Sequence, residues 1–300
     1  MQAHIIFNPT SGIIKQRHKL EDLHHGLAQA GFTPIHHPTA CEADLDGLLD
    51  QVNGLVVAAG GDGTVRAVAS RLRTRKLPLA IVPMGTANNI AYTLGIQDLK
   101  PRDLAGLAVP ERRAFDLGLV WAPWGEDIFL EGAGFGFFAD VLSTYDPAQG
   151  KSILRSLSTV IDTARRWQSY PCRLVLDEDE VMGDFVLVEM LNTRAIGPRL
   201  HLAPEADPYD GLLDVALVRN EAQESLLRYL VRGVAGGLDQ LPNVEYRRAR
   251  RLEIAWSGFP LHVDAEVRPR AGWSSPAHGL VTIEVQPRAL EIWLPGKRAE

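Results

Sequence analysis

The 300-residue chain has little cysteine, no excess of positive charge and no long apolar run, and each absence excludes a class of protein. Two cysteines, Cys41 and Cys172, are too few for a disulfide framework or a cysteine-rich zinc site. Lys and Arg number 31 against 37 Asp and Glu, and the net charge of −6 argues against a dedicated nucleic-acid binder. No window reaches the ~18 apolar residues of a transmembrane helix.

The composition that remains, with 46% hydrophobic residues, is typical of a globular protein of roughly two domains. No internal repeat and no low-complexity linker divides the chain. The low cysteine content fits a reducing cytoplasm, where we expect the protein to reside.

The first third of the sequence alternates short apolar runs with helical patterns. Ala3–Phe7, Leu55–Ala59 and Leu79–Val82 are continuous apolar runs, whereas Lys15–Ala30 and Thr64–Leu72 have helical spacing. Continuous apolar strands separated by helices are typical of a parallel sheet covered on both faces. We therefore predict an α/β domain over residues 1–112.

From about Phe115 the pattern changes to many short strands joined by turns, which predicts an antiparallel, β-rich sandwich domain over residues 113–286. Two helices are predicted within it, at 153–167 and 222–234. A cleft between the two domains is the natural place for a site. The predicted strands are Ile128–Leu130, Arg173–Leu176, Phe185–Leu191, Leu213–Val218, Leu252–Trp256, Leu261–Asp264 and Leu280–Val285.

Three polar loops follow apolar strands in the first domain: Asn8–Gly12, Gly60–Thr64 and Pro83–Asn89. Because the carboxyl ends of parallel strands meet at one edge of a sheet, we expect these loops to lie along the same edge. Pro83–Asn89 combines a flexible glycine with uncharged hydrogen-bonding side chains. A helix start capped by those side chains is the alternative for this segment.

The Gly60-Gly61-Asp62-Gly63-Thr64 loop carries the strongest chemical signal. Its glycines let the backbone approach a ligand closely, and amide groups before a helix attract phosphate. Asp62 is itself an anion, so we expect it to hold Mg²⁺, directly or through water, as a bridge to phosphate. The alternative is a tight strand-to-helix turn in which Asp62 caps the helix.

Residues Leu261–Glu266 alternate apolar and polar side chains. As one strand, they would place His262, Asp264 and Glu266 on the same face. Two carboxylates on one face can divide the work of a base and of an orienting or metal-binding group. An ordinary solvated polar face is the alternative.

These segments together resemble the soluble diacylglycerol kinase-type lipid kinases of bacteria, which share a catalytic domain with sphingosine and ceramide kinases. The Asn-Pro-x-Ser-Gly, Gly-Gly-Asp-Gly-Thr and Pro-x-Gly-Thr-Ala-Asn motifs occur in the family's order and spacing. The resemblance covers nearly the whole chain. It continues through Gly134-Phe135-Gly136 with Asp140-Val141, through Asp210-Gly211-Leu212-Leu213-Asp214, and through Val263-Asp264-Ala265-Glu266.

The resemblance implies an α/β nucleotide-binding domain, a β-rich second domain, and a C-terminal segment, 287–300, that returns to the first domain through a strand at Leu290–Leu294. It implies that Glu266, or else Asp264, accepts the proton of a lipid hydroxyl that attacks the γ-phosphorus of ATP. The residues that it implies in nucleotide binding are Asn8, Thr39, Gly60, Gly61, Asp62, Gly63, Thr64 and Thr86, with Arg66 as a further candidate for phosphate contact.

The resemblance also implies a structural Mg²⁺ held by the Asp210 side chain and by the backbone carbonyls of Asp207 and Leu212. A metal-free Asp-Gly turn is the alternative. The chain departs from the family pattern at three places: Asn89 replaces an aspartate, Ala67 a glutamate, and Ala265 the glycine of Asp-Gly-Glu.

We therefore expect an ATP-dependent lipid kinase, with diacylglycerol as the leading acceptor. The alternatives are a non-catalytic nucleotide- or lipid-binding regulator on a degenerate kinase fold, and an NAD kinase. The expected partners are a lipid substrate and, transiently, the inner face of a membrane through peripheral contact, without nucleic acid; a homodimer is left open. Arg247–Arg251 or Trp121–Trp124 could supply the membrane contact that a net charge of −6 does not favour. The alternatives are a solvated turn for the arginines and a packed turn for the tryptophans.

Overall fold

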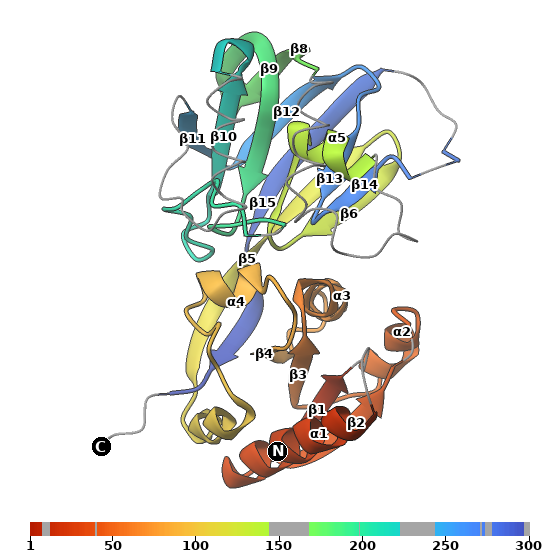
Figure 1. The fold of residues 1–300 in the computed structure, drawn as a ribbon, viewed down its shortest axis with the longest axis vertical. Helices are drawn as coiled ribbons and strands as arrows, with labels where there is room; N and C mark the ends of the chain where they lie inside the picture. The colour runs from red at the N-terminus through yellow and green to blue at the C-terminus, as the bar shows by residue number, and fades with distance from the viewer. Residues whose placement is uncertain are drawn as a thin grey trace. The chain divides into compact units, whose positions relative to one another are not determined.

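The computed structural model describes residues 1–7, 13–39, 41–143, 168–197, 199–222, 244–270, 272–273 and 278–296. The chain forms two compact units (Figure 1). Unit 1 comprises Met1–Phe115 and Pro287–Glu300, and unit 2 comprises Asp116–Gln286. The chain passes from unit 1 to unit 2 after Phe115 and returns to unit 1 after Gln286. The sequence prediction placed these two boundaries after residues 112 and 286. None of the helices in the described ranges is long and apolar enough to cross a membrane.

Unit 1 is built on a parallel sheet with the strand order β4-β3-β1-β2, as predicted for an α/β domain. The second half of β15 (Gly279–Leu294) adds a further parallel strand beside β4, through Glu291 and Ile292. The C-terminal segment thus returns to this sheet. The elements of unit 1 are β1 (Gln2–Phe7), α1 (Ile13–Gln29), β2 (Thr33–Pro38), α2 (Asp44–Leu49), β3 (Leu55–Gly60), α3 (Asp62–Leu72), β4 (Pro78–Pro83), α4 (Asn89–Thr93) and the 3-10 helix η1 (Pro101–Ala108).

The core of unit 1 explains why its strands are continuously apolar. Residues Leu55–Ala59 of β3 are completely buried, as expected for a central strand covered on both faces. Leu23 and Leu27 of α1, with Trp293 of β15, pack into the same core as alternate residues of β1 and β3. The helical spacing in α1 therefore serves to bury one face of that helix.

A pair of histidines joins β1 to β2 at the edge of this core. His4 Nε2 lies 3.0 Å from the carbonyl oxygen of Asn53, which can only accept, so Nε2 carries the proton. His4 Nδ1 lies 2.9 Å from His37 Nε2, within hydrogen-bonding distance. Burial lowers the pKa of His37 from its ordinary value of 6.5, and the proximity of His4 lowers it further. Folding therefore favours a neutral His37.

This pair predicts a loss of stability on mild acidification. The pKa of His37 is lower in the folded than in the unfolded chain, so its contribution is complete above about pH 6.5 and declines as the pH falls below that value. Melting temperatures should be measured from pH 7.5 to 5.5 for the unmodified protein and for His37→Gln. The unmodified protein should lose more stability than the variant over this range, and two parallel curves would contradict the prediction.

Unit 2 is rich in antiparallel strands, as predicted. One ladder runs β12-β8-β9-β7-β13-β14, β10 and β11 continue from β9, and β5 pairs with β6. The elements are β5 (Glu111–Ala122), β6 (Gly125–Phe129), β7 (Gly132–Gly136), α5 (Phe137–Ser143), β8 (Tyr170–Leu176), β9 (Asp179–Leu191), β10 (Leu213–Arg219), the 3-10 helix η4 (Asn220–Ala222), β11 (Glu245–Ala249), β12 (Arg251–Trp256), β13 (Leu261–Val263), β14 (Glu266–Arg268) and β15 (Gly279–Leu294).

Alternate residues of this sheet enter two separate cores. Val188 and Met190 of β9 point into one core, and Leu187 and Leu191 point into the other, against α5. Both faces of β9 are therefore buried from Phe185 to Leu191. The helix predicted at 153–167 lies outside the described residues, and so does the helix predicted at 222–234 apart from its first residue.

The prediction of one polar-faced strand from Leu261 to Glu266 is wrong. The strand ends at Val263, and the chain reverses through Asp264 and Ala265 so that Glu266 pairs with Val263. Asp264 and Ala265 have φ angles of 46° and 64°. Positive φ at both central residues is the requirement of a type I′ turn, the tightest connection of a β-hairpin. The two carboxylates thus belong to a turn and to the strand that follows it.

Candidate active-site residues

The predicted phosphate loop joins β3 to α3. Gly61 caps α3 in an extended conformation, and its carbonyl oxygen accepts the N–H groups of Thr64 at 2.9 Å and of Val65 at 3.1 Å. The loop backbone therefore turns directly into the first turn of a helix of 11 residues. The N-terminus of such a helix carries partial positive charge and attracts anions such as phosphate.

A second loop, Pro83–Asn89, packs against the first backbone to backbone. A Cβ atom on Gly85 would approach the Cα atom of Gly61 to 2.5 Å, so glycine is required there. The N–H of Met84 donates to the carbonyl of Gly60 at 2.8 Å. The Asn88 side chain then closes the loop on itself, accepting from Gly85 N at 2.9 Å and donating to Gly85 O at 3.0 Å. The two motifs form one backbone surface.

Asp62 ties the two loops together. Its Oδ1 accepts the backbone N–H of Ile90 at 3.1 Å, at the start of α4. Burial raises the pKa of Asp62 above its ordinary value, and the N–H groups of Ile90, Asn89 and Asn88 oppose that rise. The carboxylate therefore stabilises the N-terminus of α4 in addition to opening α3. Its expected role in holding Mg²⁺ stays a prediction.

The other predicted nucleotide contacts leave the sheet at the same edge. Phe7 is level with both Pro38 and Ala59, and Gly60 is level with Pro83, so the parallel strands β1, β2, β3 and β4 end side by side. This arrangement confirms the common edge for the loops after β3 and β4. Thr39 follows β2 and is buried, Arg66 is half-buried on α3, and Thr86 is exposed. Asn8, and with it the loop Asn8–Gly12, lies outside the described residues.

In unit 2, the Asp264 carboxylate is an acceptor for three backbone amides. Leu130 N donates to Oδ2 at 2.8 Å, and Glu131 N and Gly132 N donate to Oδ1 at 2.8 and 3.1 Å. The N–H of Asp264 in turn donates to Gly132 O at 2.9 Å. Asp264 thus fixes the β13–β14 turn to the β6–β7 connection. A carboxylate committed in this way is a weaker candidate for a base than Glu266.

The turn predicts that Ala265→Gly will stabilise the protein. An alanine with positive φ is strained, and glycine removes that strain, although part of the gain is lost with a methyl group that packs beside the α5 core. The free energy of unfolding should rise by about 0.5 kcal/mol, whereas Ala265→Val should lower it by about 1 kcal/mol or more. Urea unfolding of both variants tests this, and a fall for the glycine variant would contradict it.

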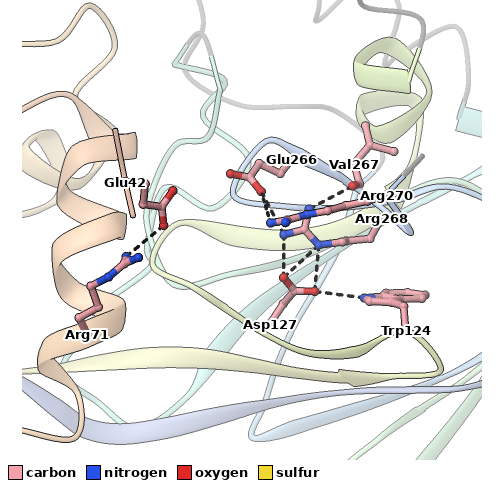
Figure 2. A network of polar contacts seen from close by, with 8 residues as sticks. All are labelled: Glu42, Arg71, Trp124, Asp127, Glu266, Val267, Arg268 and Arg270. Atoms are coloured by element: carbon pink, nitrogen blue, oxygen red, sulfur yellow. Dashed lines mark hydrogen bonds and ion pairs between the residues drawn. The ribbon is translucent and has the colours of Figure 1, made fainter. Parts of the chain in front are cut away.

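Glu266 lies in a network of charges on β14 and β6 (Figure 2). Its Oε2 accepts from Arg268 Nη2 at 3.0 Å and from Arg270 Nη2 at 3.4 Å. Arg268 also donates to both carboxylate oxygens of Asp127. The other pair drawn in the figure, Glu42 with Arg71, belongs to unit 1 and ties α3 to the segment before α2.

The predicted metal loop, Asp207–Leu212, is held by hydrogen bonds and an ion pair, within the loop and with Arg248 and Asp116 outside it. Asp210 Oδ1 accepts Leu212 N at 2.9 Å, and its Oδ2 forms an ion pair with Arg248. Buried Asp116 accepts Gly211 N at 2.8 Å. No group of three His, Cys, Asp or Glu side chains within the described ranges could hold a metal ion. In this arrangement the charge of the Asp210 carboxylate is balanced by the Arg248 guanidinium. Mg²⁺ at Asp207, Asp210 and Leu212 stays a prediction.

Sequence reasoning missed one buried ionisable pair. His262 and Glu189 are completely buried, with His262 Nε2 2.7 Å from Glu189 Oε2. Gly134 lies between them in the sheet, paired with both, and a Cβ atom on Gly134 would come within 2.5 Å of Glu189 Oε2. The signal available in the sequence was the strand Gly132–Gly136, in which every second residue is glycine.

Comparisons with known proteins agree with both units. The family model described as "Diacylglycerol kinase catalytic domain" matches residues 2–120, and that of the "YegS C-terminal NAD kinase beta sandwich-like domain" matches residues 147–294. A diacylglycerol kinase of Mycobacterium tuberculosis is 30% identical over 217 residues, covering 70% of each chain. One from Bacillus subtilis is 28% identical over 281 residues, covering 88% of this chain and 89% of its own.

The fold agrees with a solved structure as well. A crystal structure of a diacylglycerol kinase from Bacillus anthracis matches 99% of this chain and 97% of its own with a TM-score of 0.71, at 20% sequence identity. At that identity the match speaks for the fold alone. The family models and the curated relatives together show that the chain belongs to the diacylglycerol kinase family of lipid kinases.

Proposed function

We propose that the protein transfers the γ-phosphate of ATP to the hydroxyl group of a lipid, with diacylglycerol as the leading acceptor. The observation that supports this best is the backbone contact between the Gly60–Thr64 and Pro83–Asn89 loops. This contact holds two glycine motifs together at the start of α3, where the partial positive charge of the helix N-terminus favours phosphate. Members of the same family are named for this activity.

The chemistry assigns one role to each unit. In unit 1 the loops hold the phosphates of ATP, with Gly60, Gly61, Gly63 and Thr64 at the helix start. In unit 2 Glu266 accepts the proton of the lipid hydroxyl. At the same time the hydroxyl oxygen bonds to the γ-phosphorus, and the bond between the γ-phosphorus and the ADP leaving group breaks. Most of the rate enhancement in phosphate transfer comes from positioning and charge neutralisation, to which the base adds a smaller part. Mg²⁺, when bound, would neutralise phosphate charge, and we propose Asp62 as its side-chain contact.

The acceptor lipid implies that the protein visits a membrane surface. The Arg247–Arg251 segment is a poor candidate for that contact, because Arg247, Arg248 and Arg251 form ion pairs with acidic residues of the same unit. Such pairs cancel the charge that would attract an anionic membrane. Trp124 is packed among other tryptophans, whereas Trp121 is 38% exposed. We propose Trp121 as the membrane-contacting residue of that segment.

A transfer experiment separates this function from its alternatives. ATP labelled in its γ-phosphate should be offered with a panel of diacylglycerol, other glycerolipids, sphingoid bases and NAD. We expect labelled phosphate on diacylglycerol. Transfer to NAD alone would make the protein an NAD kinase, and ATP binding without transfer to any acceptor would make it a nucleotide-binding regulator.

A further inference from the structure

A buried arginine lies directly beside the proposed base. The Arg268 side chain is only 4% exposed, in the last position of β14, whereas Glu266 is 38% exposed at its start. Residues two apart on a strand point to the same side, so the two side chains meet without any distortion of the backbone. A guanidinium that is buried this deeply must be paired, since an isolated buried charge is very costly.

Asp127 of β6 supplies the first partner and fixes the plane of the guanidinium. Arg268 Nε lies 2.9 Å from both carboxylate oxygens of Asp127, and Nη2 lies 2.7 Å from Oδ1 (Figure 2). A planar arginine fork held through two nitrogens cannot rotate away from its carboxylate. The direction of its remaining N–H groups is then determined by β6.

Asp127 is itself held in place by an aromatic cluster. The indole Nε1 of Trp124 donates to Asp127 Oδ2 at 3.1 Å. Trp124 packs edge-on against Trp256 and Trp273, with ring centroids 5.3 and 6.2 Å apart. Trp256 belongs to the buried core of unit 2, so the contacts of Trp124 connect Asp127 to that core.

The last donors of Arg268 are directed at its own strand and at the proposed base. Nη1 donates to the carbonyl of Val267 at 3.1 Å, and Nη2 donates to Glu266 Oε2 at 3.0 Å. Arg270 reaches the same oxygen at 3.4 Å, but its side chain is 73% exposed. One guanidinium is therefore fixed and one is loosely held, although both contact the same carboxylate oxygen.

We propose that Arg268, anchored by Asp127 and Trp124, is the positioning residue that holds the Glu266 carboxylate ionised and oriented for proton transfer. This inference rests on the proposed function, in which Glu266 is the base. It separates Arg268 from Arg270, which has the same charge and shares the contact but has a side chain that is 73% exposed. Arg270 therefore provides a matched control.

The test compares Arg268→Gln, Arg268→Lys and Arg270→Gln in the full chain, each alone and in the Glu266→Gln background. Arg268→Gln should lower kcat about 100-fold, the cost of a misplacement of about 1 Å, with little change in KM for ATP. Arg268→Lys keeps the charge without the fork and should recover part of the loss. Arg270→Gln should change kcat less than about threefold. In the Glu266→Gln background, Arg268→Gln should cause almost no further loss.

The outcomes that overturn the proposal are distinct from those that overturn the function. Normal kcat in Arg268→Gln would overturn the positioning role. It would also be overturned if Arg268→Gln lowered the residual rate of Glu266→Gln by the same factor as it lowers the rate of the unmodified protein. Unchanged turnover in Glu266→Gln alone removes the base itself. If Arg268→Gln fails to fold because Asp127 is left unpaired, Asp127→Asn with Arg268→Gln removes both charges. That folded double variant should still lose kcat, and normal kcat in it would also overturn the proposal.

Discussion

Glu266→Gln should lower the rate of phosphate transfer by about 10³-fold, within the range found for the removal of a general base. Glutamine keeps the size of the side chain and one acceptor oxygen but cannot take up the proton of the lipid hydroxyl. ATP affinity should change little, because the loops Gly60–Thr64 and Pro83–Asn89 belong to the other unit. Single-turnover transfer of labelled phosphate, together with ATP titration, measures the two effects separately.

Glu253→Gln is the matched control for this variant. Glu253 lies on β12 of the same unit and pairs with Arg251, two residues away, at 2.7 Å, which repeats the Glu266–Arg268 spacing. It should have almost no effect on turnover. Unchanged turnover in Glu266→Gln itself would transfer the role of base to Asp264 or to solvent.

Asp264→Ala should lower the free energy of unfolding of unit 2 by about 3 kcal/mol. Three backbone N–H groups lose a charged acceptor, and hydrogen bonds to charged groups contribute about 1.5–3 kcal/mol each, partly regained from water. Scanning calorimetry should show a melting temperature lower by roughly 6–12 °C for a unit of this size. Asp264→Asn retains one acceptor oxygen, so its melting temperature should lie between those of Asp264→Ala and the unmodified protein.

This prediction distinguishes a structural aspartate from a chemical one. Loss of activity in Asp264→Ala should follow loss of folded protein, and should therefore recover when the assay temperature is lowered. An Asp264→Ala variant that melts like the unmodified protein and still fails to transfer phosphate would contradict the structural role and place Asp264 in the chemistry.

The parts of the fold that the sequence predicted are those set by local pattern. Leu55–Ala59 and Leu79–Val82 are apolar without interruption because both faces of a parallel sheet are covered, and that pattern predicted β3, β4 and their shared edge. The glycine loops followed from the same reasoning, since loops after parallel strands converge. Leu280–Val285 and Leu290–Leu294, predicted as two strands, are parts of the single strand β15.

The parts that escaped prediction depend on pairing between distant segments. The residue types of Asp264-Ala265 do not predict a type I′ turn, because alanine rarely occupies a position with positive φ. The alternation of apolar and polar residues through Glu266 therefore suggested a continuous strand. Arg268 and Asp127 are 141 positions apart. Their contact exists only after β6 and the β13–β14 hairpin have come together. Only the spacing of Glu266 and Arg268 was visible locally.

The passage of β15 from unit 2 into unit 1 has a consequence for synthesis on the ribosome. Residues 1–115 emerge first. The strand that pairs with β4 belongs to residues 287–296, and so does Trp293, which packs into the core of unit 1. At 5–20 residues per second, the intervening segment delays that strand by roughly 10–30 s. During that interval the edge of β4 is unpaired, and an unpaired strand edge is a template for aggregation. The nascent chain should therefore be most dependent on chaperones while unit 2 is being synthesised.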